Sequence, residues 1–251
     1  MTPQEARSLI EPIFYMKEME ILERFANSSK DSIFTKHKQT DFSSVFIPGS
    51  RKDRVLLVAH VDTVWHDSPK IEVGYGNEGH EIFYSEIREK GLDKDDDPYF
   101  DGIGFGADDR AGVAMLWMYR QLGHSLLLVN GEERGTRGSR YLMSNSEMAA
   151  EIQEHQFAVE FDRHGYNDIV FYSVWTKSFK DYVANVTKYY PQPGTHTDIC
   201  VLCRKICGVN ISVGYYGEHG PNEVLDVNDW LNTYKVAGKW LSQKNLPKFP
   251  L

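Results

Sequence analysis

Six side chains that are typical metal ligands are spread along this 251-residue chain, each at the edge of an apolar run. They are His60, Asp108, Glu132, Glu133, Asp162 and His219. Zinc accepts imidazole nitrogens and carboxylate oxygens, and two metals about 3.5–4 Å apart need one bridging carboxylate and further ligands for each ion. The set therefore indicates a hydrolytic site with two metals.

Asp108 is well placed to be the bridging carboxylate. It lies in the segment GADDRAG (106–112), whose glycines let the backbone turn sharply. Asp62 follows His60 by two positions at the end of an apolar run. In a strand both side chains point to the same face, so Asp62 could accept the ring N–H of His60 and orient it.

Glu132 and Glu133 follow the apolar run at 125–130. One of two adjacent glutamates can bind a metal while the other is free to act as a general base. Each motif is a weak signal alone, because an isolated H-x-D is more often a polar strand end and a Glu-Glu pair is usually solvated. The ordered set is far more specific.

Strand and helix patterns alternate along the chain, which predicts an α/β layered fold with a largely parallel central sheet. Continuous apolar runs predict strands at 54–60, 125–130 and 157–161. Further strands are expected at 169–175, 184–189 and 209–213, with a strand or loop at 34–46. Helices are expected over 3–27, divided at Pro12, and over 112–123, 138–154, 198–207 and 227–241.

Bulk composition limits the possible partners and the location. The net charge of −8 argues against a nucleic-acid groove or an anionic membrane surface as partner, and no apolar run approaches the roughly 20 residues of a membrane span. Cys200, Cys203 and Cys207 do not form a disulfide framework, and the N-terminus has no secretory pattern, so a reducing, cytoplasmic location is predicted. The spacing of the cysteines predicts one buried helix face.

Other polar residues leave more than one interpretation open. Residues 66–100, with the acidic run at 93–97, are interpreted as a surface insertion or a hairpin; a calcium loop is a weaker alternative because the EF-hand spacing is absent.

Tyr215 and Tyr216 could hydrogen-bond a tetrahedral intermediate or pack in the core. His164, His196 and Asp198 could support the site, or, for the last two, form a turn. His37, His66, His80, His124 and His155 have no partner pattern and are expected at the surface.

The ordered motifs resemble the co-catalytic zinc exopeptidases, which include bacterial leucyl aminopeptidases, peptidase T and glutamate carboxypeptidases. GADDRAG is similar to the family element G-[AT]-D-D-K-A-G, with Arg110 in place of lysine, and GEERG (131–135) is similar to E-E-x-G. GEHGPNE (217–223) resembles the C-terminal H-x-x-x-E element, and GTHTD (194–198) resembles a G-T-D segment before a helix. The resemblance covers about residues 50–241 and implies a three-layer α/β/α zinc-exopeptidase (phosphorylase/hydrolase-like) fold with a mostly parallel, mixed sheet.

The resemblance also implies a role for each site residue. His60 and Asp162 would bind one Zn²⁺, Glu133 and His219 the other, and Asp108 would bridge the two ions, with Co²⁺ or Mn²⁺ as substitutes. Asp62 would orient His60, and Glu132 would be the general base that deprotonates a zinc-activated water. A cis peptide after Asp108 is also implied.

Many relatives carry a lid and dimerisation domain between the fourth and the last ligand segments. Only 56 residues separate Asp162 from His219, too few for such a domain. We therefore expect residues 1–251 to form a single catalytic domain, which favours an aminopeptidase or small-peptide exopeptidase acting on small peptides or aminoacyl amides. The alternatives are a deacylase or carboxypeptidase acting on N-acyl amino acids, and a non-catalytic binding protein on the same fold. No basic residue can be assigned from the sequence to hold a substrate carboxylate, and the oligomeric state is left open.

Overall fold

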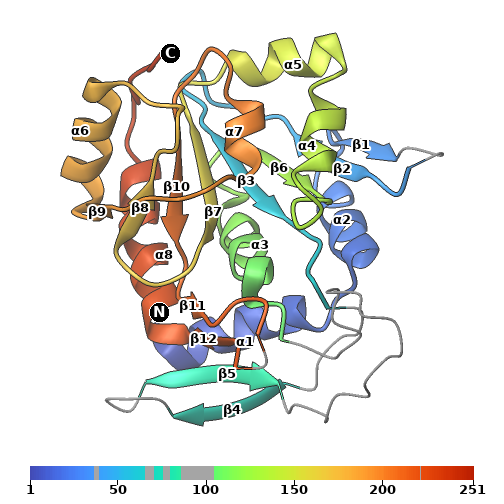
Figure 1. Cartoon of the computed structure of the whole chain (residues 1–251), viewed down its shortest axis with the longest axis vertical. Helices are drawn as coiled ribbons and strands as arrows, with labels where there is room; N and C mark the ends of the chain where they lie inside the picture. Colours follow the sequence, from blue (N-terminus) through green and yellow to red (C-terminus); the bar gives the residue numbers. More distant parts are fainter. Residues whose placement is uncertain (37–39, 66–70, 76–79, 86–104, 221) are drawn as a thin grey trace.

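The computed structural model describes residues 1–36, 40–65, 71–75, 80–85, 105–220 and 222–251. In these residues an eight-stranded sheet has the order β1-β2-β6-β3-β7-β10-β8-β9 (Figure 1). Its strands are β1 (Ile33–Lys36), β2 (Ser43–Ile47), β3 (Leu56–His60), β6 (Ser125–Val129), β7 (Ala158–Arg163), β8 (Asp168–Val170), β9 (Tyr190–Pro191) and β10 (Gly208–Ser212).

The centre of this sheet is parallel, as predicted from the continuous apolar runs. β3 pairs in parallel with β6 on one side and with β7 on the other, and β7 pairs in parallel with β10. Antiparallel pairs lie outside this centre, where β2 joins β6 and β1, and β8 joins β10. The predicted mostly parallel, mixed sheet is therefore confirmed.

Helices cover both faces of the sheet and complete the three layers. Alternate residues of β3 supply the two cores: Leu57 and Ala59 pack with one set of helices, and Leu56 and Val58 with the other. The first core includes residues of α1 (Pro3–Phe14), α2 (Glu18–Ala26), α3 (Ala107–Tyr119), α6 (Lys177–Thr187) and α8 (Val227–Leu241). The second includes residues of α4 (Arg137–Leu142), α5 (Ser146–Gln153) and α7 (Asp198–Leu202).

A small antiparallel sheet lies beside α1 and α8, at the bottom of the view in Figure 1. Its order is β11 (Tyr215–Tyr216), β12 (Val224–Asp226), β5 (Glu81–Ser85) and β4 (Ile71–Tyr75). β4 and β5 pair antiparallel, so the hairpin interpretation agrees with the described residues 71–75 and 81–85. The acidic run at 93–97 lies outside the described residues. Among the described helices, none is long and apolar enough to cross a membrane.

Aromatic packing fixes the segment that enters the predicted Asp108 loop. Phe105 is buried, and its ring stacks on that of Phe14 in α1 with centroids 5.0 Å apart. Phe83 of β5 meets the same Phe14 ring edge-on at 6.1 Å. Burying one such side chain contributes roughly 1.5–3 kcal/mol, so this cluster holds the chain in place immediately before Gly106.

The predicted helix at 112–123 is α3, which begins earlier, at Ala107, and ends at Tyr119. Two other predicted helical ranges are divided differently in the structure. The break in 3–27 was predicted at Pro12, but Pro12 lies inside the last turn of α1, and the helix ends at Phe14. A second helix starts after Lys17, whose backbone N–H donates to the Glu20 carboxylate at 2.8 Å. The range 138–154 divides into α4 and α5, because the Asn145 side chain caps the start of α5.

Three other predicted elements were wrong in type or length. Residues 184–189 were predicted as a strand but mostly belong to α6, whose buried Phe179, Val183 and Thr187 recur at helical spacing. The strand at 169–175 is only the short β8, which ends before Tyr172 with its positive φ of 50°. Helix 198–207 ends at Leu202, because Cys203 is extended. The three cysteines therefore do not share a helix face; all are free, and Cys203 and Cys207 are buried.

His124 and His155 were expected at the surface but are buried, at 3% and 0% exposure. His124 Nδ1 accepts from the Val55 backbone, while its Nε2 donates to the carbonyl of Leu241 at 2.8 Å. His155 bonds the Ser125 hydroxyl at 2.7 Å, and burial lowers its pKa to about 4. Both are neutral structural side chains whose partners lie far away in the sequence. His37 and His66 lie outside the described residues.

Candidate metal centre

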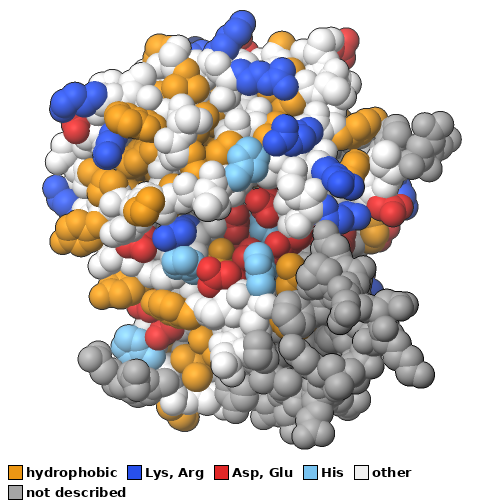
Figure 2. All heavy atoms as spheres, in the orientation of Figure 1, with side chains coloured by type: hydrophobic (Ala, Val, Ile, Leu, Met, Phe, Trp, Pro, Cys, Tyr) orange, Lys and Arg blue, Asp and Glu red, His pale blue; other side chains and the backbone are white. Residues whose placement is uncertain are grey.

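Three neighbouring parallel strands bring the predicted site residues to one edge of the main sheet. His60 ends β3, Asp162 lies near the end of β7, and Glu132 follows the end of β6 by three positions. The carboxyl ends of parallel neighbours meet at the same edge of a sheet, so these side chains converge. Figure 2 shows Asp, Glu and His side chains gathered in a hollow near the middle of the molecular face.

Asp108 and His219 enter the same hollow from outside the strands. Gly106 has a φ of +64°, which lets the chain turn sharply before Asp108, and the Asp108–Asp109 peptide is cis, as the resemblance implied. Gly112 allows α3 to approach β7, because a Cβ there would lie 2.0 Å from a backbone oxygen of that strand. His219 lies in the loop between β11 and β12.

Asp108 contacts both histidines through different carboxylate oxygens. Its Oδ1 lies 3.0 Å from His60 Nε2, and its Oδ2 lies 3.2 Å from His219 Nε2. Asp162 Oδ1 is 3.4 Å from the same His60 nitrogen, and Glu133 Oε1 is 3.0 Å from His219 Nε2. The structure thus brings together all five residues predicted as ligands, with Asp108 between the two histidines.

The spacing of these donor atoms fits the coordination shell of zinc. Zinc holds nitrogen and oxygen ligands at about 2.0–2.2 Å, so tetrahedral neighbours are roughly 3.4 Å apart. The separations from 3.0 to 3.4 Å around each histidine are close to that value. Donor atoms of His60, Asp108 and Glu133 all lie within 4.8 Å of one another, as do those of His60, Asp109 and Asp162. The donor set therefore fits divalent ions of the zinc type.

Asp62 holds both His60 and the turn that carries the two glutamates. His60 Nδ1 donates to the backbone carbonyl of Asp62 at 3.0 Å, whereas the nearest carboxylate oxygen lies 3.5 Å away. That carboxylate accepts the backbone N–H groups of Glu132 at 3.2 Å and Glu133 at 3.3 Å. Asp62 therefore orients His60 mainly through its backbone, and because Nδ1 must donate to a carbonyl, Nε2 keeps its lone pair for a metal.

The two adjacent glutamates have different surroundings. Glu133 contacts His219, whereas no described residue hydrogen-bonds the carboxylate of Glu132, which lines the cavity. Burial raises the pKa of Glu132 to about 9, and the nearby charges of Asp162 and Asp198 act in the same direction. A carboxyl with a raised pKa that faces a cavity suits proton transfer to and from a substrate.

Negative charge accumulates in the hollow around the predicted ligands. Burial raises the pKa of Asp162 and Glu133, and it raises that of Asp198 to about 7. Hydrogen bonds to Asp108 and Glu133 raise the pKa of His219 to about 11. Metal binding requires ionised carboxylates and a neutral imidazole and releases their protons, so divalent ions would offset this concentration of charge.

Glu223, which the sequence placed only within a motif, holds the Asp108 segment. Its carboxylate is 3% exposed and accepts three hydrogen bonds. Oε1 accepts the backbone N–H of Asp108 at 2.9 Å, and Oε2 accepts that of Gly106 at 2.9 Å and the indole N–H of Trp65 at 3.0 Å. The same residue thus ties the loop of His219 to the loop of Asp108. Its signal in the sequence was the spacing H-x-x-x-E.

Tyr215 and Thr197 each donate a hydrogen bond to one carboxylate oxygen of Asp162. The Tyr215 hydroxyl donates to Oδ1 at 3.2 Å, and the Thr197 hydroxyl donates to Oδ2 at 3.0 Å. Tyr216 instead donates to Asp229 at 2.6 Å. Tyr215 therefore supports a predicted ligand, and Thr197 is a supporting residue that sequence reasoning missed.

Asp109 and Asp198 support the site from buried positions. Asp109 accepts the backbone N–H groups of His60 at 3.2 Å and Gly112 at 2.9 Å, which ties β3 to the start of α3. Asp198 accepts the Ser139 hydroxyl at 2.5 Å and is fully buried. The Asp108–Asp109 pair was visible in the sequence, but the hydrogen-bond partners of Asp109 were not.

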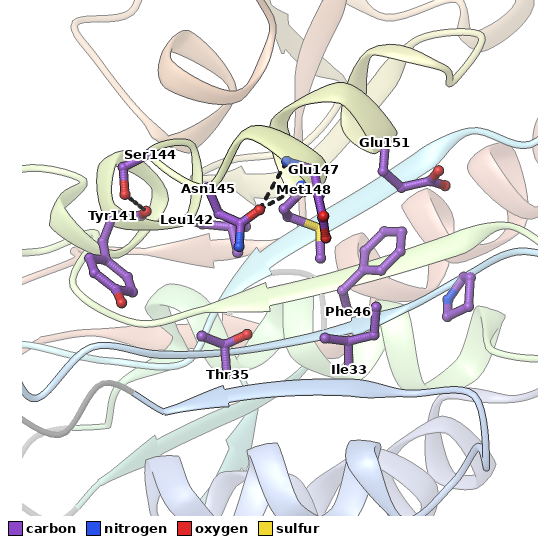
Figure 3. Close-up of a pocket in the computed structure, with 11 residues that line it drawn as sticks. Ile33, Thr35, Phe46, Tyr141, Leu142, Ser144, Asn145, Glu147, Met148 and Glu151 are labelled. Carbon is purple, nitrogen blue, oxygen red and sulfur yellow. Dashed lines mark hydrogen bonds between the residues drawn. The ribbon is translucent and has the colours of Figure 1, made fainter.

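A larger cavity lies between the β1–β2 edge of the main sheet and helices α4 and α5 (Figure 3). Its volume is about 540 Å³, against about 160 Å³ for the cavity beside the metal centre. Its walls include Ile33, Phe46, Leu142 and Met148, and none of the predicted site residues lines it.

The sequence matches the model of Peptidase family M28 over residues 45–198, which contain four of the five predicted ligands. None of the curated proteins compared with the sequence matches it. Aminopeptidase PepT from Bacillus cereus ATCC 10987 has a similar structure, with a TM-score of 0.65 at 12% identity over 96% of this chain and 98% of that chain.

Two further solved structures have the same architecture. A tripeptidase from Staphylococcus aureus subsp. aureus Mu50 gives a TM-score of 0.63 at 12% identity, over 96% of this chain and 98% of that chain. The TET1 peptidase of Pyrococcus horikoshii, which can assemble into a tetrahedron or a large octahedral shell, gives 0.57 at 14% identity, over 94% and 99%. At these identities the likeness shows the fold, and the predicted three-layer α/β/α architecture is confirmed.

Proposed function

Because the chain belongs to Peptidase family M28 and is therefore a metallopeptidase, we propose that it is an aminopeptidase for short peptides that holds two zinc ions. The family match confirms the predicted family and the predicted enzyme class. The observation that carries the proposal is the position of Asp108, which faces a different histidine with each carboxylate oxygen, at 3.0 and 3.2 Å. A carboxylate in that position can be shared by two ions.

Five residues would hold the pair of ions. His60 and Asp162 would hold one, Glu133 and His219 the other, and Asp108 would be shared. Zinc bound there would activate a water molecule and polarise the scissile carbonyl.

Glu132 moves the protons in the proposed reaction. Its carboxylate takes a proton from the attacking water and delivers it to the nitrogen of the leaving group. One feature supports this role: the carboxylate lines the cavity without a hydrogen bond to any described residue. The contact of Asp62 with the Glu132 backbone keeps this residue in place beside its neighbour, Glu133.

Peptide substrates are supported by the names of two similar structures, an aminopeptidase and a tripeptidase. A carboxypeptidase or a deacylase for N-acyl amino acids is the alternative within the same chemistry. The single-domain organisation, the cytoplasmic location and the predicted absence of nucleic-acid and membrane partners stay predictions.

The proposal is tested by assaying the zinc-loaded protein on aminoacyl anilides, tripeptides and N-acyl amino acids. We expect release of the N-terminal residue from unblocked substrates, no turnover of N-acylated ones, and loss of activity after chelation. Hydrolysis of N-acyl amino acids alone would replace the aminopeptidase assignment with the deacylase. No hydrolysis of any substrate after loading with zinc, cobalt or manganese would overturn the proposal.

A further inference from the structure

The cavity beside the metal centre contains one arginine among its described wall residues. Its volume is about 160 Å³. The charged and imidazole side chains that line it are Asp108, Glu132, Asp162, Arg163, His164, Glu218, His196 and His219. Four of these are carboxylates, three are histidines and one is a guanidinium, so only one wall residue carries a permanent positive charge.

The histidines of this wall already have partners. His164 Nδ1 contacts Glu218 Oε1 at 2.5 Å, His196 bonds the Thr136 hydroxyl at 3.1 Å, and His219 contacts Asp108 and Glu133. These imidazoles are therefore engaged in contacts with the protein itself.

Arg163 differs from them, because its guanidinium has no hydrogen bond or ion pair with any described residue. Its Nε is buried and lacks a partner. Both oxygens of the adjacent Asp162 accept from Tyr215 and Thr197, and Glu218 is engaged with His164. No described carboxylate neutralises this guanidinium in the cavity wall, so it is available to an anionic ligand that enters the cavity.

The end of β7 accounts for the position of Arg163. Consecutive strand residues normally point to opposite faces, yet Asp162 and Arg163 both line this cavity. The pairing of β7 with β10 shifts register here, so that Arg163 is opposite Ser212. An irregularity of this kind redirects side chains. The backbone at Arg163 is fixed, because its carbonyl accepts the N–H of Val213 at 2.9 Å.

We propose that Arg163 binds the free C-terminal carboxylate of the substrate, so that the enzyme prefers dipeptides and tripeptides to longer chains. The planar guanidinium matches a carboxylate with two parallel hydrogen bonds. Arg163 is the chain neighbour of Asp162, with Cα atoms about 3.8 Å apart, and each substrate residue adds only about 3.5 Å. A carboxylate at Arg163 therefore lies one or two residues beyond a bond positioned at the metal centre.

This inference rests on the proposed peptidase function and names the substrate class of the same site. It also supplies the basic residue that could not be assigned from the sequence. Recognition of the carboxylate adds a second requirement to the site, because a peptide that is amidated at its C-terminus, or too long for its C-terminus to reach Arg163, loses this contact.

The experiment compares matched free-acid and C-terminally amidated dipeptides and tripeptides with the zinc-loaded enzyme. For the wild type we expect kcat/KM to be about 10 to 100 times higher for the acid than for the amide, since a charge-assisted hydrogen bond is worth about 1.5–3 kcal/mol. In Arg163→Gln this ratio falls toward one, mainly through a higher KM for the acids, and Arg163→Lys keeps part of it. Arg204→Gln, which removes an exposed arginine outside the cavity, should keep the wild-type ratio.

A second measurement separates recognition from catalysis. Calorimetry with zinc-loaded Glu132→Gln measures binding of the acid and the amide without turnover, and we expect tighter binding of the acid by a similar factor. Equal binding and equal kcat/KM for acids and amides, with peptides hydrolysed, would overturn the role of Arg163 and leave the peptidase function intact. An unchanged ratio in Arg163→Gln would also overturn it. Absence of hydrolysis combined with preferential binding of the acid would instead contradict the proposed peptidase function alone.

Discussion

Two cavities lined by described residues differ in size and in chemistry, and the smaller one lies at the candidate site. The cavity under α4 and α5 measures about 540 Å³ and has a wall of mixed polarity, in which the Asn145 side chain caps α5 (Figure 3). Glu151 of this wall pairs with Arg54 at 2.8 Å. The cavity at the ends of β3, β6 and β7 measures about 160 Å³ and faces Asp108, Glu132 and Asp162.

The difference shows that volume alone does not locate reactivity in this fold. In the larger cavity Ser144, Asn145 and Glu151 make contacts within the local structure. The smaller one is lined by Asp108, Glu132 and Asp162, and burial raises the pKa of Glu132 to about 9. Behind this wall, burial raises the pKa of Asp198 to about 7. Such an arrangement is costly unless a cation or a bound proton offsets it, and the histidines that accompany the carboxylates make a metal the suitable cation.

The largest expected effect is on kcat, and it distinguishes Glu132 in the smaller cavity from Glu147 in the larger one. Glu132→Gln keeps the size of the side chain but removes proton transfer, so we expect kcat to fall about 10²- to 10⁴-fold while bound zinc is unchanged. Glu147→Gln, in the wall of the larger cavity, should leave kcat at the wild-type value. Steady-state kinetics with elemental analysis checks both variants, and a Glu132→Gln protein with normal turnover would remove Glu132 from its role.

A smaller effect is expected from Glu223, which holds the Asp108 segment. Glu223→Gln replaces an acceptor oxygen with an amide N–H that faces a backbone N–H, so the Asp108 segment loses part of its support. Changes to groups that support metal ligands typically lower metal affinity about 10- to 100-fold. Glu151→Gln, which breaks an ion pair beside the larger cavity, is the control. Equal zinc affinity in the wild type and Glu223→Gln, measured by competition with a chelator, would contradict this role.

The pH dependence of metal-free stability also follows from the smaller cavity. The folded pKa values of Glu132, Asp198 and Glu223 are raised to about 9, 7 and 7, and that of His219 to about 11. The folded protein therefore binds more protons than the unfolded chain, and stability from these groups is lost as pH rises from about 5 to 9. We expect the Tm of the metal-free protein to fall over that range and the fall to shrink after zinc loading. A Tm that rises from pH 6 to 9 without metal would contradict this account.

The smallest expected effect on activity comes from the wall of the larger cavity. Met148 of α5 is 8% exposed and packs in the second core, with Leu142 and Ile152. Met148→Ala should lower the free energy of unfolding by about 2 kcal/mol, toward the low end for such truncations, since the site already adjoins open space. We expect kcat/KM to stay at the wild-type value. A loss of kcat/KM larger than tenfold in a protein that is fully folded would show that the two cavities are coupled.

The parallel centre of the fold was predictable, because strands buried on both faces give continuous apolar runs such as those of β3 and β6. The edges were not. Residues 184–189 contain enough β-branched and aromatic side chains to suggest a strand, but the helix starts earlier, where Thr176 caps it at Phe179 N–H. The pattern of apolar residues could not reveal this helix start, because the cap is the hydroxyl of a single residue, Thr176.

His60, Glu133 and Asp162 were visible in the sequence because each comes at or after the end of an apolar run, and the strand order brings these runs together. Asp108 and His219 were visible through their motifs, because they enter the site from outside the strands. What could not be predicted depends on partners that are distant in the sequence. The contacts of Glu223 with Asp108, and of Thr197 with Asp162, form only in the folded chain. Arg163 could not be identified from the sequence, since an arginine at the end of a strand is ordinarily solvated. It stands out only in the folded chain, where the neighbouring carboxylates of Asp162 and Glu218 already bind other residues.

A titration of the metal-free protein with zinc tests the central claim most directly, because the claim is that five residues form one centre for two ions. The account predicts binding of two zinc ions per chain and recovery of peptidase activity as the sites fill, with Asp108→Asn reducing the stoichiometry. Binding of no zinc, or full peptidase activity in protein shown by elemental analysis to hold no divalent metal, would contradict it.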